Sequence, residues 1–217
     1  PAVFVTGVTT PVSAEFTAAA VTDILTASER ELTNAALSST TGVTGAVNAF
    51  CGLYPADIND DGAIEVPSPG PIPSRVEGDQ CVGWVSYNGA GEAETVLWTY
   101  HNLEDGWYLR LPESWAGQVR AERSATGSDA SVTFYYQRFD ESGVGPRDTA
   151  ILRITTLTGT GREVRATRGS RFPLSRQSDV IYTAELPENP PWDQCMTAEE
   201  VREAFSLIAR EWIPLDT

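Results

Sequence analysis

The chain has 217 residues, of which 30 are acidic and 15 basic, and its formal net charge is −15. This length is enough to bury about 70% of the surface that the unfolded chain exposes, so neither a disulfide nor a metal is needed merely to fold. The negative charge repels phosphate backbones and anionic membrane surfaces, which argues against nucleic acid as a partner, and no apolar run is long enough for a transmembrane segment.

The start of the chain and its cysteines indicate whether the protein works inside or outside the cytoplasm. Pro1 opens the sequence without the Met and charged segment of a signal peptide, which predicts an extracytoplasmic protein, secreted or anchored at the cell surface as a lipoprotein, from which an export signal has been removed, with or without preceding domains. Cys51, Cys81 and Cys195 are too few and too widely spaced for a zinc site. Two states stay open for them: a Cys51–Cys81 bridge in an oxidising compartment, or buried free thiols.

The first 70 residues are predicted to form a small antiparallel β module. Three segments alternate β-branched or aliphatic residues with polar ones. These predicted strands are Ala2–Gly7, Val21–Ala27 and Glu31–Leu37. Residues 67–74 then hold four prolines in eight positions, which cannot form a helix or a central strand and will run extended. We therefore place a domain boundary there, with a linker over residues 71–80.

An acidic loop, Asp57-Ile-Asn-Asp-Asp-Gly-Ala-Ile-Glu65, precedes this boundary. Oxygen-bearing side chains stand at loop positions one, three, five and nine, and glycine stands at position six, where the chain must turn sharply. Hard cations prefer such ligands, so the loop is predicted to hold Ca²⁺ as a structural cofactor. The predicted ligands are the side chains of Asp57, Asn59, Asp61 and Glu65 and the carbonyl of Ala63. The alternative is an acidic turn that binds no metal.

The pattern D-x-N-x-D-G-x-x-E between predicted strands resembles the calcium loop of FG-GAP or integrin-type β-propeller repeats, which are common in bacterial surface proteins. The resemblance covers residues 1–70 and implies ligands at positions one, three, five, seven and nine. It also implies a single blade, either left from a larger propeller or packed against the next domain. Position twelve is Ser68 where an EF-hand has a bidentate glutamate, so the EF-hand and dockerin families fit less well.

Residues 81–217 are predicted to form an α+β domain based on an antiparallel sheet. Turn-forming segments such as Glu104-Asp-Gly106 separate its β-rich segments. The predicted strands are Cys81–Asn88, Glu94–His101, Trp107–Leu111, Val119–Arg123, Ser131–Phe139, Ala150–Thr158 and Asp179–Leu186. The whole chain is thus predicted to be α+β and predominantly antiparallel β.

The end of the chain predicts one amphipathic helix. Thr197-Ala-Glu-Glu200 has the form of a capping box, and apolar residues then recur at helical spacing until Pro214. The predicted apolar stripe consists of Val201, Ala204, Phe205, Ile208 and Trp212. Such a stripe must be buried, and we expect it to cover one face of the preceding sheet.

The second domain also carries a resemblance of pattern. Gly106-Trp-Tyr-Leu-Arg-Leu-Pro-Glu-Ser-Trp115, further strands, Ile181-Tyr-Thr-Ala-Glu-Leu-Pro187 and a closing helix are together similar to small α/β sandwich domains of the PsbP and Mog1 type in bacterial lipoproteins. The resemblance covers residues 80–213. It implies a binding or assembly role at the cell surface and no catalytic residue.

Two further clusters have two interpretations each. Five arginines could bind the carboxylates or phosphates of a cell-wall polymer, or could pair with acids of the same chain or lie in a solvated loop. They are Arg162, Arg165, Arg168, Arg171 and Arg176. Six tryptophans could stack on sugars, but most fall at strand or helix positions that predict core packing. They are Trp84, Trp98, Trp107, Trp115, Trp192 and Trp212.

No residue set indicates a reaction. His101 is the only histidine, and no nucleophile-elbow or H-E-x-x-H segment surrounds it. Adjacent acids such as Glu104 and Asp105 could suggest the carboxylate pair of a glycosidase, but capping and solvation at turns and helix starts already explain them. We therefore expect a non-enzymatic extracytoplasmic or cell-surface protein of binding or adhesion type, with a protein or polysaccharide as ligand. Two alternatives stay open: a hydrolase of glycans or cell walls, and a structural spacer domain.

Overall fold

The computed structural model describes residues 53, 56–63, 65–70, 72, 80–87, 93–138 and 147–208. The chain divides into two compact units: unit 1 is Pro1–Pro69, Val82–Trp98 and Ala209–Thr217, and unit 2 is Gly70–Cys81 and Thr99–Ile208. The three strands predicted before residue 40 lie outside the described residues. The predicted scheme of a module, a linker and a second domain stays a prediction.

The described part of unit 1 is antiparallel β structure. Its strands are β1 (Val66–Pro69), the part of β2 (Gln80–Tyr87) from Val82 onward and the first part of β3 (Ala93–Asn102), in the order β1-β2-β3. Strand β1 pairs with β2 so that Val66 lies opposite Val85 and Pro69 opposite Val82. Among the described strands, β1 lies at the edge of its sheet, and this position suits its prolines because proline has no N–H for a second neighbour.

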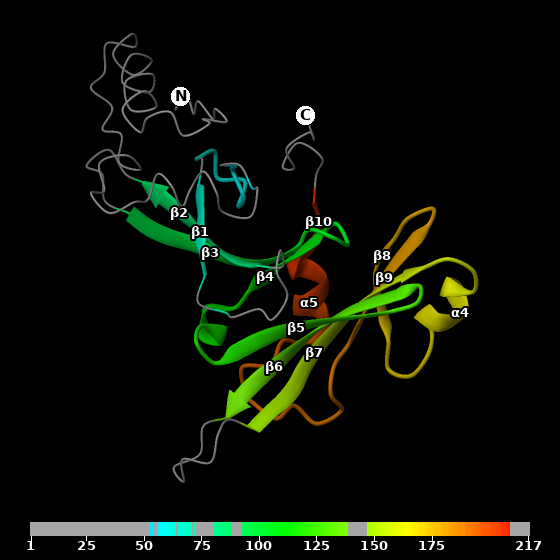
Figure 1. The fold of residues 1–217 in the computed structure, drawn as a ribbon. Helices are drawn as coiled ribbons and strands as arrows, with labels where there is room; N and C mark the ends of the chain where they lie inside the picture. The colour runs from blue at the N-terminus through cyan, green and yellow to red at the C-terminus, as the bar shows by residue number, and fades with distance from the viewer. Residues whose placement is uncertain are drawn as a thin grey trace. The chain divides into compact units, whose positions relative to one another are not determined.

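Unit 2 contains the rest of β3 and two short strands beside it, in the order β3-β4-β10, and a second, five-stranded antiparallel sheet in the order β5-β6-β7-β9-β8 (Figure 1). The bounds are β4 (Trp107–Leu111), β5 (Val119–Thr126), β6 (Asp129–Arg138), β7 (Arg147–Thr158), β8 (Phe172–Arg176), β9 (Val180–Glu185) and β10 (Phe205–Leu207). The helices are η1 (Glu113–Trp115), α4 (Arg162–Ala166) and α5 (Ala198–Ala204). The prediction of a chain dominated by antiparallel β structure is confirmed for the described residues.

The core of unit 2 is built from apolar residues that lie opposite one another on adjacent strands. On β6, Val132 and Phe134 are fully buried and lie opposite Ile154 and Leu152 of β7. Aromatic rings fill the space beside them: Phe134 meets Tyr100 edge-on at 5.1 Å between ring centroids. Buried aromatic pairs of this kind add specific contacts to the area that they remove from water.

The start of the C-terminal helix agrees with its prediction. Thr197 is the N-cap of α5, and its hydroxyl oxygen accepts a hydrogen bond from the Glu200 backbone N–H at 3.3 Å. The Glu200 carboxylate accepts the return bond from the Thr197 backbone N–H at 2.7 Å. The capping box is therefore confirmed.

The end of this helix differs from its prediction. Helix α5 ends at Ala204, and Phe205–Leu207 form β10, which pairs antiparallel with β4. The expectation that Phe205 and Ile208 continue a helical stripe is therefore wrong: backbone pairing with β4 and burial of the Phe205 ring outweigh the local periodicity. Trp212 lies outside the described residues.

Helix α5 lies beside β4 and β10 (Figure 1), and Arg110 of β4 donates a hydrogen bond to the Glu203 carbonyl in α5. None of the helices in the described part of the chain has the length and apolar character to span a membrane.

Candidate calcium site

The predicted calcium loop is closed at its base by backbone hydrogen bonds in unit 1. The Ala56 N–H donates to the Glu65 carbonyl at 3.1 Å, and the Glu65 N–H donates to the Ala56 carbonyl at 2.9 Å. Inside the loop, Asp60 and Gly62 have positive φ angles of 61° and 85°. Glycine adopts this conformation without strain and aspartate more readily than most residues, so the loop can reverse within a few residues.

Three of the predicted ligands lie together within this turn. The two carboxylate oxygens of Asp57 accept hydrogen bonds from the N–H groups of Asp61 and Gly62, at 3.0 and 2.9 Å. The Asn59 amide donates to Asp61 Oδ2 at 2.9 Å, and the Ala63 N–H donates to Asp61 Oδ1 at 2.7 Å. Each oxygen that accepts one such bond keeps a further lone pair for a cation.

Glu65, the ligand predicted at position nine, is the most unusual group of the loop. Its side chain is 0% exposed. Oε2 accepts a hydrogen bond from the Ile58 N–H at 3.2 Å, and Oε1 has no hydrogen-bond partner among the described residues. Burial raises the pKa of this carboxyl group, and the nearby carboxylates of Asp61 and Asp57 raise it further. A buried anion with an unsatisfied oxygen is costly unless a cation balances it.

The donor set suits a hard cation. It consists of oxygens only: three carboxylates, one amide and the predicted carbonyl of Ala63. Among the described residues, no group of three or more His, Cys, Asp and Glu side chains is arranged to hold a metal ion. The predicted calcium site is of another kind, because two of its five predicted ligands are the Asn59 amide and the Ala63 backbone carbonyl. The unpartnered Glu65 oxygen is the observation that fits a bound cation.

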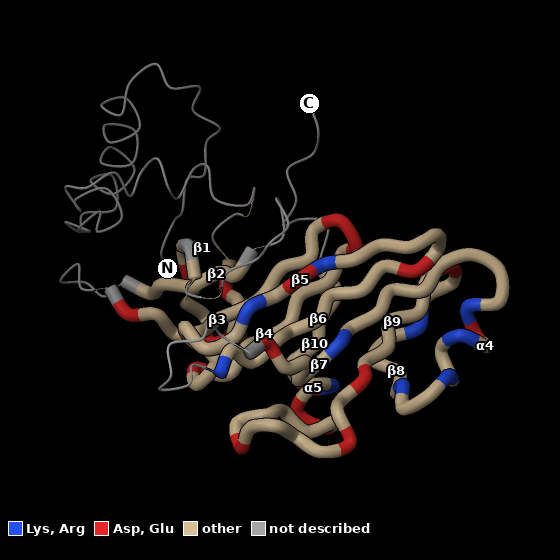
Figure 2. The backbone as a smooth tube through the Cα atoms, turned by 60° about the horizontal axis from the view of Figure 1, so that its bottom comes forward, with Lys and Arg blue, Asp and Glu red and all other residues tan. Residues whose placement is uncertain are grey.

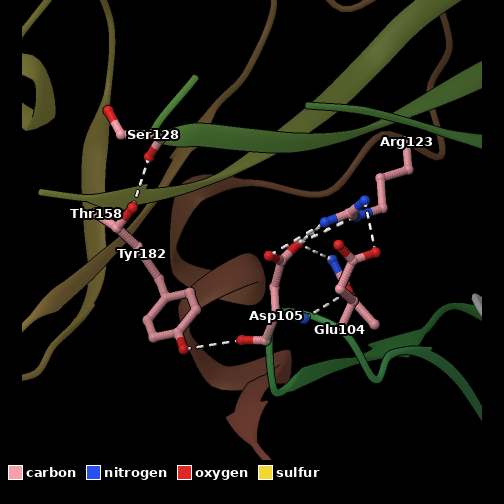
Figure 3. A network of polar contacts seen from close by, with 7 residues as sticks. Glu104, Asp105, Arg123, Ser128, Thr158 and Tyr182 are labelled. Atoms are coloured by element: carbon pink, nitrogen blue, oxygen red, sulfur yellow. Dashed lines mark hydrogen bonds and ion pairs between the residues drawn. The ribbon is translucent and has the colours of Figure 1, made fainter. Parts of the chain in front are cut away.

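In unit 2, the adjacent acids Glu104 and Asp105 both bind Arg123 (Figure 3). Arg123 lies 2.7 Å from the Glu104 carboxylate, and its Nε donates to Asp105 Oδ2 at 3.2 Å. Asn102 also donates to Asp105 Oδ2, at 2.7 Å, and the Tyr182 hydroxyl donates to the Asp105 carbonyl at 2.9 Å. The cluster ties the β3–β4 turn to β5 and β9, so these carboxylates have structural partners.

His101, the only histidine, is fully buried. Its imidazole stacks on the Tyr108 ring, with centroids 5.0 Å apart and 9° between the planes. Burial lowers the pKa of His101 to about 3. The ring is therefore neutral at physiological pH and takes part in packing.

The arginine cluster gathers around α4 and β8 (Figure 2). Three of its members form ion pairs: Arg165 with Asp129, Arg171 with Glu185 and Arg176 with Glu163. Arg162 donates instead to the carbonyl groups of Gly159 and Ser178. The interpretation as ion-pair partners of acids in the same chain is confirmed for Arg165, Arg171 and Arg176.

Three of the described tryptophans and one of the described cysteines are buried. Trp84, Trp107 and Trp115 are all 0% exposed, which confirms the predicted core packing for them. Cys81 and Cys195 are free thiols, and burial raises the pKa of Cys81 to about 11. Cys51 lies outside the described residues.

Comparison with known proteins gives no relative: no family model, no curated protein and no solved structure matches the chain. The FG-GAP and PsbP or Mog1 resemblances therefore stay predictions.

Proposed function

We propose that the loop from Asp57 to Glu65 binds one calcium ion as a structural brace, in a non-enzymatic extracytoplasmic protein of binding or adhesion type. The single observation that carries the calcium proposal is the fully buried Glu65 side chain, whose Oε1 has no hydrogen-bond partner among the described residues. A divalent cation held jointly by Glu65, Asp57 and Asp61 would balance this charge.

The brace would act on the strand that follows the loop. Glu65 closes the loop through its backbone bonds to Ala56, and β1 begins at the next residue. A cation that links the loop to the Glu65 side chain would thus hold the start of β1. Binding of this kind stabilises the folded state because the unfolded chain does not hold the ligands together.

The binding or adhesion role rests on the other features of the chain. Calcium at millimolar concentration is found outside cells, where weak extracellular modules with dissociation constants of about 10⁻⁴–10⁻³ M are filled. The acid pair of Glu104 and Asp105 and the buried His101 have structural roles, which supports a binding protein over a hydrolase. The ligand would be a protein or a polysaccharide of the cell surface.

The test is calorimetric titration of the chelator-treated full chain with calcium. We expect one ion per chain, and we expect Asp57→Asn and Asp61→Asn to weaken binding by about tenfold or more, since each removes a charged ligand. The matched control is Asp60→Asn, which removes an exposed carboxylate of the same loop that is not a predicted ligand, and asparagine tolerates the positive φ angle.

Two results would overturn the proposal. One is the absence of binding at about 10 mM calcium, which is about ten times the weakest dissociation constant of extracellular modules. The other is an equal loss of affinity in Asp60→Asn, which would mean that the loop attracts cations only through its overall charge.

A further inference from the structure

Unit 2 has a hollow of about 430 Å³ at the end of β4. Arg110, Leu111, Pro112 and Ser114 line it, together with the segment from Asp193 to Met196 and Glu200 in the first turn of α5. Small-molecule sites usually have volumes of about 300–1,000 Å³. The hollow is thus large enough for a small ligand.

The cationic group of the hollow is Arg110, an exposed residue of β4. Its Nη2 donates a hydrogen bond to the Glu203 carbonyl, which anchors the guanidinium against α5. A guanidinium carries five N–H donors in a fixed plane, and the described residues place no carboxylate on this one. Arg110 can therefore offer a forked pair of donors to a ligand carboxylate.

The anionic groups of the hollow are Asp193 and Glu200. Glu200 Oε2 accepts bonds from the Thr197 backbone N–H at 2.7 Å and from the Thr197 hydroxyl at 2.9 Å. These bonds hold the carboxylate in place and lower the pKa of Glu200, so it is ionised at neutral pH. Asp193 is exposed and adds a second carboxylate.

The apolar part of the lining comes from Leu111 and Met196, both of which are buried, and from Pro112. An unbranched thioether such as Met196 adapts to side chains of different shape. The hollow therefore combines a cation, two carboxylates and an apolar surface.

We propose that this hollow binds a free α-amino acid with an apolar side chain. The ligand carboxylate meets Arg110, its ammonium group meets Asp193 and Glu200, and its side chain lies against Leu111 and Met196. A simple anion would meet two repelling carboxylates, and a simple cation would leave Arg110 unmatched. A dipolar molecule such as an α-amino acid satisfies both charges. The proposal goes beyond the calcium loop, which lies in unit 1, so either can fail without the other.

The test is saturation-transfer NMR and calorimetry on the full chain with L-leucine. Two analogues isolate the charged groups: 3-methylbutylamine lacks the carboxylate, and 4-methylpentanoate lacks the ammonium group. We expect saturable binding of L-leucine and at least about tenfold weaker binding of each analogue, since each loses a charge-assisted interaction.

The variants Arg110→Gln and Asp193→Asn should each weaken L-leucine binding by about tenfold. The matched controls are Arg168→Gln and Asp179→Asn, which alter exposed residues outside the hollow and should leave affinity unchanged. The proposal is overturned if L-leucine gives no saturable signal, if either analogue binds as tightly as L-leucine, or if the control variants lose as much affinity as the pocket variants.

Discussion

The loop from Asp57 to Glu65 and the cluster around Asp105 both bring carboxylates together, but they balance the negative charge differently. At Asp105 the chain supplies a cation, because Arg123 binds both Asp105 and Glu104. In the loop, the described residues supply backbone N–H groups and one amide side chain, and no arginine. Calcium is therefore proposed at the loop and not at Asp105, because the Glu65 carboxylate is buried and the described residues give the loop no cation.

The largest loss of stability should come from removing Arg123, the cation of the Asp105 cluster. Arg123 and Asp105 are only 10% and 12% exposed in their side chains. Arg123→Ala leaves the Asp105 carboxylate without its cation, and we expect a loss of about 3 kcal/mol in unfolding free energy, measured by urea denaturation.

The control for this prediction is Glu104→Ala. Glu104 binds the same arginine, but its side chain is 67% exposed, so its removal should cost less than about 1 kcal/mol. Equal losses in the two variants would contradict the view that buried charge makes the Asp105 cluster a clamp.

The next effect tests packing in unit 1, where no ion pair is involved. A Cβ atom at Gly83 would lie 2.5 Å from the Trp98 ring, so Gly83→Ala forces the indole to move. We expect a loss of about 2 kcal/mol in unfolding free energy. In a Trp98→Leu background the same substitution should cost much less, and an equal cost in both backgrounds would show that the Trp98 contact is not the cause.

The smallest effect concerns pH and His101. The pKa of His101 is about 3 in the folded protein and 6.5 ordinarily. Between pH 6.5 and pH 3, His101 is therefore protonated in the unfolded chain and neutral in the folded chain. The contribution of neutral His101 to the unfolding free energy is complete above pH 6.5 and is lost as the pH falls toward 3. Between pH 7 and 5.5 we expect His101 to account for about 1 kcal/mol of lost stability.

The matching variant is His101→Phe, which keeps a flat ring over Tyr108 and cannot be protonated. Thermal unfolding at pH 7 and pH 5.5 should show a smaller loss for the variant than for the native chain. The same loss in both would assign the pH dependence to other groups.

Local chemistry was predictable from the sequence, and long-range pairing was not. The loop joins residues no more than nine positions apart, and the capping box joins Thr197 to Glu200, so a short pattern contains every partner. By contrast, the bond from Tyr182 to Asp105 spans 77 positions. The hollow beside Arg110 likewise joins segments about eighty residues apart along the chain, and no local motif marks it.

Strands β8 and β10 and helix α4 were not predicted from the sequence, because each depends on contacts with residues distant along the chain. Strand β8 contains Pro173 and shows no clear alternation, and it exists because it pairs with β9. Helix α4 has only five residues, and it buries Ala166 against Leu157 and Ile181. In β10, pairing with β4 replaced the helix that the periodicity predicted.

Calcium binding through Glu65 is tested most directly by the thermal unfolding of Glu65→Gln, with excess chelator and with calcium. Without calcium, a neutral amide of the same shape replaces a buried carboxylate, so the midpoint should rise above that of the native chain. Calcium at ten times its dissociation constant should stabilise the native chain and Asp60→Asn by about 1.4 kcal/mol, a few degrees in midpoint, and should leave Glu65→Gln unchanged. If Glu65→Gln is less stable than the native chain in chelator and is still stabilised by calcium, Glu65 is not a calcium ligand.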